Sequence, residues 1–265
     1  MTWVVGGSSL FGFGVMVSDV RVSWNDGTEA DLLQKAYPVG RFLLAGFAGS
    51  VNIGFRLIAS LQSFLIPPDN STSSAWKPEW VAEHWYPEAA QIFANASSEE
   101  QAAHSQLLIV GVSPTEDLGA PEFRRVYLIK LEAPDFKPTV FPKPLSVCHI
   151  GSGSEVPAYE QVVASFFDLH SPTMKAVTAG PAAWARILGD SVGRLVQDDP
   201  REGISPHVHI QVCSLGGFNM NTNDFTRVYP NGKQVEFRMP QIASTAAEFE
   251  ALCKNIGKAT LRAAA

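Results

Sequence analysis

The sequence predicts an α+β fold, because pairs of short apolar segments alternate with longer segments whose apolar residues recur at helical spacing. Residues 2–6 and 11–18 form the first pair. Both are apolar and rich in β-branched residues, and small residues separate them, as in a hairpin. Residues 32–37 and 41–45 form a second pair, and a helix over residues 50–65 is expected to follow it. This alternation of strand pairs with helices is the basis of the α+β prediction.

Turn and cap residues mark the limits of the first elements. A strand over residues 20–24 ends at an Asn-Asp-Gly sequence, residues 25–27, which is a strong turn signal. Ser50 is expected to cap the helix that follows the second strand pair, and the two prolines at 67–68 are expected to end it.

The rest of the chain continues the alternation and shows neither an internal repeat nor a domain linker, so one domain over residues 1–265 is expected. Residues 218–265 are expected to form a C-terminal hairpin and helix. Further strands are expected at 106–112, 125–131, 147–150, 207–213 and 227–238 (a hairpin), and further helices at 76–96, 155–170, 173–197 (interrupted at 180–181) and 244–262.

The composition argues against two classes of protein. The net charge is −6 and the pI is about 5.5, whereas nucleic-acid binding needs a basic surface. No apolar run approaches the roughly 20 residues of a membrane-spanning helix, and a secretory signal is not expected at the start of the chain. Acidic residues recur in predicted loops at 26–31 and 198–202. They are interpreted either as solvated surface or as the lining of an internal chamber.

Cysteine and histidine residues give no sign of a disulfide framework or a metal centre. The three cysteines, Cys148, Cys213 and Cys253, are odd in number and widely spread, which favours a reducing compartment, and a cytoplasmic protein is expected. His207 and His209 share one face of a predicted strand, but no Cys or carboxylate lies at ligand spacing. They are interpreted as core or surface histidines, and no metal or cofactor is predicted.

The residue after the initiator methionine carries the first chemical signal. A small side chain at position 2 favours enzymatic removal of Met1, which would leave Thr2 with a free α-amine. The pKa of such an amine is near 8, so a usable fraction is unprotonated near neutral pH. A hydroxyl and a base on one residue make a nucleophile that needs no histidine.

Three further signals follow at defined distances. Asp19 lies 17 residues after Thr2, Lys35 lies 16 after Asp19, and Gly49 lies 14 after Lys35 in a Gly-Phe-Ala-Gly-Ser turn. This layout, with a Gly-Ser-Gly-Ser turn at 151–154, resembles the β-type subunits of proteasomes and their bacterial relatives. Among these N-terminal-nucleophile hydrolases, the HslV-type peptidases and the betaproteobacterial proteasome homologue are the most similar. The resemblance covers residues 2–60 and returns at 148–154.

The resemblance implies a fold and an activity. The fold would be a four-layer αββα sandwich, in which residues 66–100 form an insertion. The activity would be that of a threonine endopeptidase acting on peptides or unfolded proteins. Its active sites would lie inside a homo-oligomeric double ring, and an ATP-dependent unfoldase is a candidate partner. Neither nucleic acid nor a membrane is an expected partner.

The resemblance also assigns five catalytic residues. Thr2 would attack through its hydroxyl, while its amine takes the proton. Lys35 would lower the pKa of that amine and stabilise the alkoxide, and Asp19 would keep Lys35 charged and oriented. The N–H of Gly49 would stabilise the oxyanion, and Gly46 is the alternative donor. Ser152 would hydrogen-bond the Thr2 amine.

By the same resemblance, a specificity pocket lies beside this turn. Val22, Leu33 and Phe47 would line it, Val51 would form its floor, and Ser23 with Gly49 would pair their backbones with a substrate strand. An apolar pocket implies cleavage after hydrophobic residues. Alternatively, these apolar side chains belong to the core.

One part of the family pattern is missing. The family has an Asp three residues before a Ser near the last core strand. Ser205 stands near that place, but no Asp lies three residues before it. Two other functions therefore remain open: an amidase of the same superfamily acting on a small amide, and a non-catalytic ring subunit that keeps Met1.

Overall fold

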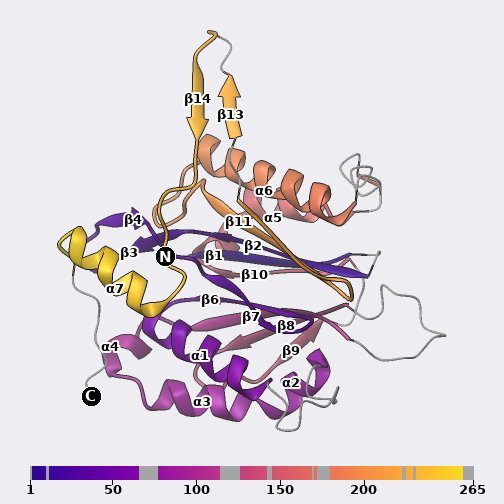
Figure 1. The fold of residues 1–265 in the computed structure, drawn as a ribbon, viewed down its shortest axis with the longest axis vertical. Coiled ribbons are helices and arrows are strands. Elements are labelled where there is room, and N and C mark those ends of the chain that lie inside the picture. Colours follow the sequence, from indigo (N-terminus) through magenta and orange to yellow (C-terminus); the bar gives the residue numbers. More distant parts are fainter. Residues whose placement is uncertain are drawn as a thin grey trace.

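The fold is mixed α+β, as the sequence predicts, and its main feature is two stacked five-stranded sheets (Figure 1). The computed structural model describes residues 2–9, 12–65, 77–113, 126–141, 145–168, 170–171, 180–222, 225–228 and 231–258. Within these residues, every helix is too short or too polar to cross a membrane.

Both large sheets are antiparallel throughout. The first has the strand order β10 (Val147–Gly151), β1 (Trp3–Ser8), β2 (Phe13–Asp19), β11 (Val208–Ser214) and β12 (Gly217–Thr222). The second has the order β5 (Ala36–Gly40), β6 (Leu43–Ala48), β7 (Gln106–Val112), β8 (Val126–Glu132) and β9 (Thr139–Phe141).

Alternating side chains place three apolar layers around these sheets. On β1, Val4 points into the layer between the two sheets, whereas Trp3 and Val5 point to the outer face of the first sheet. Val4 meets Leu108 and Val110 of β7 in the inner layer. Each fully buried side chain of this size contributes about 1.5–3 kcal/mol, so the two faces of β1 fix its register.

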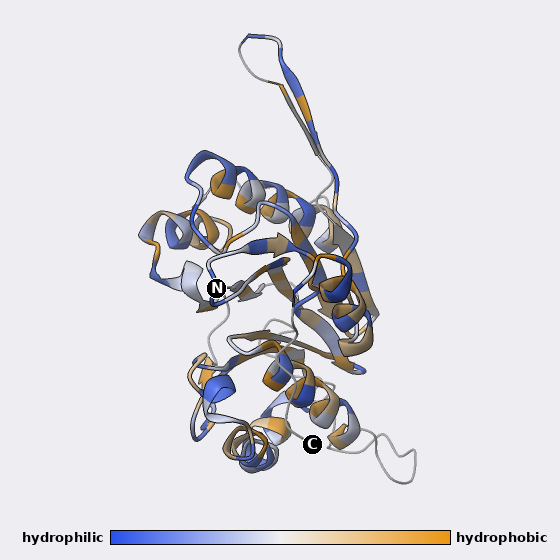
Figure 2. Ribbon diagram, turned by 90° about the vertical axis from the view of Figure 1, so that its left-hand side faces the viewer, coloured by the Kyte–Doolittle hydropathy of each residue, from blue (hydrophilic) through white to orange (hydrophobic). Residues whose placement is uncertain are grey.

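Helices cover both outer faces (Figures 1 and 2). On the second sheet lie α1 (Val51–Phe64), α2 (Pro78–His84), α3 (Tyr86–Ala94) and the short α4 (Ser98–Gln101). On the first lie α5 (Pro157–Ser165) and α6 (Pro181–Asp198). Helix α1 begins where expected, because the Ser50 hydroxyl accepts a hydrogen bond from the Ile53 N–H at 3.3 Å.

Three smaller elements complete the fold. The hairpin of β3 (Arg21–Ser23) and β4 (Glu29–Asp31) turns at the predicted Asn-Asp-Gly sequence. The hairpin of β13 (Phe225–Val228) and β14 (Gln234–Phe237) projects from the body as an arm (Figure 2). Helix α7 (Ala246–Asn255) packs beside α1, with the Phe249 and Phe55 rings 6.4 Å apart.

Two predicted elements differ from the structure. Lys35 was expected inside a strand over 32–37, but β5 begins at Ala36, and Leu33 forms only an isolated bridge to Ala243. The single helix expected at 76–96 is two helices, α2 and α3, joined at Trp85. The predicted helix limits at 67–68 and beyond 258, most of the segment 173–180, Trp76 and Met1 lie outside the described residues.

The aromatic residues of the predicted insertion pack on their own chain. Trp85 is fully buried and donates its indole N–H to Ser60 at 3.1 Å. The rings of Trp80 and Phe64 stack with centroids 4.8 Å apart. Packing within the chain therefore accounts for these two tryptophans.

Candidate active site

A buried ion pair joins two of the predicted catalytic residues. The Lys35 ammonium lies 2.7 Å from Asp19 Oδ1, and the side chains are 1% and 0% exposed. Burial lowers the pKa of Lys35 below its usual 10.5, and the carboxylate of Asp19 opposes that shift. Because a buried ammonium without a partner costs several kcal/mol, the pair holds both side chains in place.

Both Asp19 oxygens accept further hydrogen bonds from the backbone. Oδ1 accepts the Trp3 N–H at 2.9 Å, and Oδ2 accepts the N–H groups of Arg21 and Ser205, each at 3.2 Å. Asp19 is the last residue of β2, and Trp3 is the first residue of β1. The carboxylate therefore anchors the Thr2–Trp3 linkage beside the ammonium of Lys35.

Ser152 holds the other side of Thr2. Thr2 is 8% exposed, its backbone nitrogen lies 3.2 Å from Ser152 Oγ, and the same hydroxyl lies 3.3 Å from the Thr2 carbonyl oxygen. The preceding residue must be glycine: Gly151 has φ +81°, and a Cβ there would lie 1.9 Å from the Thr2 carbonyl oxygen. The backbone of the Gly-Ser turn therefore lies directly against Thr2.

A side-chain relay that the sequence did not reveal supports this turn. The Gly151 N–H donates to Gln106 Oε1 at 2.8 Å, and Gln106 Nε2 donates to Glu132 Oε1 at 2.5 Å. Lys130 lies 2.9 Å from the same Glu132 oxygen. Gln106 opens β7 in the second sheet, so its amide connects the two sheets at the edge where Thr2 lies.

Two glycines at the end of β6 are required by close contacts within the chain. Gly49 has φ +97°, and a Cβ there would lie 2.5 Å from the Ala103 carbonyl oxygen, so only glycine fits. Gly46 lies inside β6, and a Cβ there would lie 2.8 Å from Met16 and from Val4. Gly46 therefore lets the sheets approach each other.

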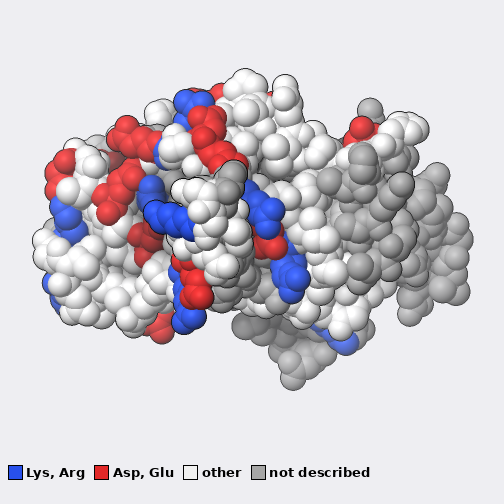
Figure 3. Space-filling model, turned by 90° about the horizontal axis from the view of Figure 1, so that it is seen from above, with Lys and Arg blue, Asp and Glu red and all other residues white. Residues whose placement is uncertain are grey.

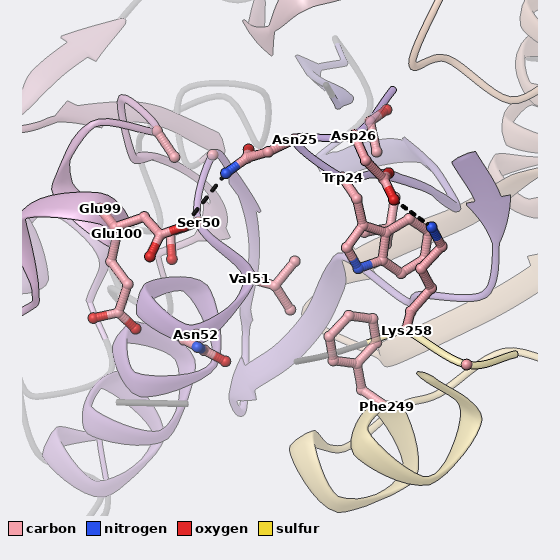
Figure 4. A pocket seen from close by; sticks show the side chains of 15 residues that line it. Trp24, Asn25, Asp26, Ser50, Val51, Asn52, Glu99, Glu100, Phe249 and Lys258 are labelled. Carbon is pink, nitrogen blue, oxygen red and sulfur yellow. Dashed lines mark hydrogen bonds and ion pairs between the residues drawn. The ribbon is translucent and has the colours of Figure 1, made fainter. Parts of the chain in front are cut away.

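A cavity of about 450 Å³ opens beside Gly49 (Figure 4). Three of the five predicted substrate residues, Val22, Ser23 and Val51, line it together with Gly49, but Thr2 does not. Its complete lining is Val22, Ser23, Trp24, Asn25, Asp26, Gly49, Ser50, Val51, Asn52, Glu99, Glu100, Ala103, Phe249, Gly257 and Lys258.

The other two predicted pocket residues are core residues instead. Leu33 is 0% exposed and Phe47 is 2% exposed, and neither lines the cavity. The Phe47 ring lies 5.9 Å from the Phe55 ring and stacks on Tyr37 at 6.4 Å. Both side chains therefore belong to the apolar layer between the second sheet and its helices, which is the alternative that the sequence left open.

A carboxylate on another strand contacts Ser205. The Ser205 hydroxyl donates to Asp31 Oδ2 at 2.7 Å, and Arg21 Nε donates to Asp31 Oδ1 at 2.7 Å. Burial alone would raise the pKa of Asp31, but the hydrogen bonds from Arg21 and Ser205 outweigh it and the pKa is lowered. Asp31 and Arg21 are register partners in the β3–β4 hairpin, which the predicted turn could have indicated.

Among the described residues, no three His, Cys, Asp or Glu side chains gather as metal ligands would. His207 precedes β11, and His209 is 6% exposed, where burial lowers its pKa to about 4. Burial raises the pKa of the Cys213 thiol to about 12 and that of the Cys148 thiol to about 11. Neither thiol is therefore an activated nucleophile.

A scan of the chain against protein-family models finds no match, and a search of the curated proteins finds none either.

Proposed function

We propose that the protein is a threonine peptidase of the N-terminal-nucleophile type, built on the four-layer αββα sandwich of proteasome β subunits. One observation carries the proposal. The Asp19 carboxylate binds the Lys35 ammonium at 2.7 Å and the N–H of Trp3 at 2.9 Å, while Ser152 Oγ lies 3.2 Å from the Thr2 nitrogen. Thr2, which precedes β1, is thereby held by Ser152 on one side, and the neighbouring Trp3 N–H is held by the carboxylate that pairs with Lys35.

The reaction follows from these positions once Met1 has been removed. The Thr2 hydroxyl oxygen bonds to the carbonyl carbon of the substrate, and the hydroxyl proton passes to the Thr2 α-amine. The Lys35 ammonium stabilises the alkoxide, and the N–H of Gly49 stabilises the oxyanion of the tetrahedral intermediate. The C–N bond then breaks, the leaving amine takes the proton, and water hydrolyses the acyl ester.

Lys35 would also lower the pKa of the Thr2 α-amine, which acts as the base. Its ammonium lies in a site with almost no solvent, where like-charge repulsion lowers the pKa of a neighbouring amine. Asp19 neutralises part of that charge, and its other hydrogen bonds come from backbone N–H groups. We propose peptides or unfolded proteins as substrates and a homo-oligomeric double ring as the assembly. We propose an ATP-dependent unfoldase as a partner of that assembly.

Intact-mass measurement with an epoxyketone peptide tests the proposal. We expect a chain that begins at Thr2 and one adduct joined to both its hydroxyl and its α-amine. Thr2→Ala should lose the adduct and reduce peptide hydrolysis by several orders of magnitude. Thr2→Ser, which keeps both groups, should retain the adduct.

Other outcomes identify the alternatives. A chain that keeps Met1 and binds no inhibitor would instead be a non-catalytic ring subunit. A processed chain that stays monomeric and hydrolyses only small amides would be an amidase. An adduct on a cysteine would contradict the threonine mechanism.

A further inference from the structure

Two residues that lie far apart in the sequence, Arg21 and Ser205, each bind the same two carboxylates. Their backbone N–H groups both donate to Asp19 Oδ2, each at 3.2 Å. Their side chains donate to Asp31: the Ser205 hydroxyl to Oδ2 at 2.7 Å, and Arg21 Nε to Oδ1 at 2.7 Å. Asp31 is therefore connected to the buried Asp19–Lys35 pair through two separate bridges.

The two bridging N–H groups set the orientation of the Asp19 carboxylate. Oδ1 accepts the Lys35 ammonium at 2.7 Å and the Trp3 N–H at 2.9 Å, while Oδ2 accepts the bridging groups. The torsion that turns an Asp carboxylate has only weak preferences of its own, so hydrogen bonds decide where the two oxygens point. The donors at Oδ2 therefore also fix the direction of Oδ1.

The Arg21 bridge is held by more than one contact. Arg21 Nη2 donates to Asp31 Oδ2 at 3.3 Å, and Nη1 donates to Glu29 Oε2 at 3.2 Å. Acidic side chains gather over the side of the molecule where β3, β4 and α7 lie (Figure 3), which favours a cation at this place. Two parallel contacts between a guanidinium and one carboxylate hold both groups in one plane. The position of Arg21 is therefore coupled to that of Asp31.

The Ser205 bridge has a defined hydroxyl orientation. Ser205 is 0% exposed, and its Oγ accepts the His207 N–H at 3.0 Å while it donates to Asp31. Both residues belong to the segment that leads into β11, and the Ser205 N–H of that segment reaches Asp19. Without the Asp31 carboxylate, a buried hydroxyl would lose its acceptor and the segment would lose the contact that fixes it.

Asp31 also acts on Lys35 through its charge. Among the described residues, the charged groups that influence Lys35 are Asp19 of β2, Arg21 of β3 and Asp31 of β4. Burial lowers the pKa of Lys35, the two carboxylates raise it, and the Arg21 guanidinium lowers it. Loss of the Asp31 charge would leave the repulsion from Arg21 unbalanced, so the pKa of Lys35 would fall further.

We propose that Asp31 is a positioning residue for the Asp19–Lys35 pair and acts through the two bridges of Arg21 and Ser205. The catalytic part of this inference rests on the proposed function. Asp31 fixes the two donors at Asp19 Oδ2, and Asp19 in turn places the ammonium beside the candidate nucleophile. The β3–β4 hairpin is thereby part of the site.

Asp31→Asn tests the role in catalysis. It keeps one oxygen for Arg21 but places an amide against the Ser205 hydroxyl. We expect kcat for a peptide to fall about tenfold, the value of one charge-assisted hydrogen bond, while KM stays within about twofold. The alkaline limb of the pH profile of kcat should move to lower pH, because Lys35 acts as an ammonium. Asp199→Asn removes the same charge from an exposed ion pair and should change neither.

Two results of this comparison would overturn the proposal. The first is a kcat that Asp31→Asn leaves unchanged. The second is a kcat that falls while the pH profile keeps its shape, because a merely structural loss lowers the rate without changing the charge state of Lys35.

Ser205→Ala tests the bridge with a smaller change. It removes the hydroxyl but keeps the N–H that binds Asp19, and kcat should fall several-fold. The double variant Asp31→Asn with Ser205→Ala should be no slower than Asp31→Asn alone, because both substitutions remove the same contact. Two losses that multiply in the double variant would show that Asp31 and Ser205 act independently, which would overturn the bridge.

An NMR titration of the Lys35 ammonium separates this inference from peptidase activity. The pKa of Lys35 should be lower in Asp31→Asn than in the unmodified chain, and Asp199→Asn should leave it unchanged. If this result is found in a protein that cleaves no peptide, Asp31 controls the pair and the peptidase proposal fails. If peptides are cleaved but Asp31→Asn alters neither kcat nor the pKa of Lys35, the peptidase proposal stands and the present inference fails.

Discussion

Replacing Asp19 by asparagine should destabilise the protein far more than the loss of one surface charge would. The Asp19 carboxylate accepts the Lys35 ammonium and three backbone N–H groups. Asparagine has the same shape, but it offers one oxygen and turns an amide toward the donors on the other side. The variant therefore leaves the buried ammonium without an anion, and it leaves the donors that face the new amide group without an acceptor.

The magnitude follows from the burial of the pair. Removing one partner of a buried ion pair costs about 3–5 kcal/mol, because the other charge stays desolvated. For a chain of this size that corresponds to a fall in Tm of roughly 10 °C. An exposed pair serves as the control. Asp199 lies 2.8 Å from Arg201, the side chains are 41% and 51% exposed, and Asp199→Asn should cost less than about 1 kcal/mol.

Urea unfolding of a double-mutant cycle provides the assay. Adding Lys35→Met to Asp19→Asn removes the stranded ammonium, so the double variant should be about 1–3 kcal/mol more stable than Asp19→Asn alone. If the double variant is no more stable than Asp19→Asn, the ammonium is not the source of the cost and the reasoning fails.

The pH dependence of the same pair has a defined sign. The folded pKa of Lys35 lies below 10.5, so the unfolded chain binds more protons between the two pKa values. The free energy of unfolding should therefore rise with pH through that window, relative to Lys35→Met. A difference between the two proteins that does not change with pH would contradict the lowered pKa.

Two further predictions concern a buried histidine and the relay behind Gly151. Burial lowers the pKa of His209 to about 4, so the free energy of unfolding should fall by up to about 3 kcal/mol as the pH drops from 6.5 to 4. His209→Gln should remove that loss, as measured by urea unfolding between pH 4 and pH 6.5. If the free energy of unfolding depends on pH equally in both proteins, the reasoning is wrong. Gln106→Glu places a second carboxylate beside Glu132 and should lower kcat increasingly as the pH rises. The exchanged pair Gln106→Glu with Glu132→Gln keeps one amide and one carboxylate in contact and should restore the pH profile. A loss that the exchange does not repair would show that the relay does not position the turn.

The sequence predicted local elements well wherever a turn or cap residue marks them. Ser50 caps α1, and the Asn-Asp-Gly sequence turns the β3–β4 hairpin. The prediction that Lys35 lies inside a strand failed, because the apolar residues around it have the composition of a strand. In the structure the backbone of Leu33 bridges to Ala243, more than 200 residues away in sequence. Such a long-range partner leaves no local signal.

The candidate pocket was predicted in part, for a related reason. Residue type marks Phe47 and Val51 alike as apolar, but β6 turns Phe47 into the layer beneath α1 while Val51 reaches the cavity. The acidic lining comes from segments that no short motif connects, since Glu99 and Glu100 belong to α4 and Lys258 follows α7. Only the three-dimensional fold brings these charges together.

One missed residue lay within reach of sequence reasoning. A hairpin that turns at 25–27 pairs residue 21 with residue 31, so Arg21 and Asp31 are cross-strand neighbours of opposite charge. An acidic residue expected three positions before Ser205 is defined by spacing along the chain, so that criterion cannot find a residue on another strand. In the structure the carboxylate that contacts Ser205 is that of Asp31, the cross-strand partner of Arg21.

Strand direction explains why the site residues meet at one edge. β1 lies between β2 and β10, and both run antiparallel to it, so their last residues lie beside its first. Asp19 ends β2 and Gly151 ends β10, and they flank the start of β1 where Thr2 lies. Thr2 therefore lies between the ends of the two neighbouring strands because of the strand pairing alone.

The second sheet repeats the arrangement at the same edge. Lys35 precedes β5, Gly49 follows β6 and Gln106 begins β7, and antiparallel pairing brings these three positions together. The Asp19–Lys35 pair and the Gly151–Gln106 hydrogen bond join the two edges. A shift of one residue between β1 and β2 would turn Val4 out of the inner layer and displace the Trp3 N–H from Asp19. The apolar packing that fixes the register of the sheets therefore also fixes the distance between the candidate nucleophile and its cation.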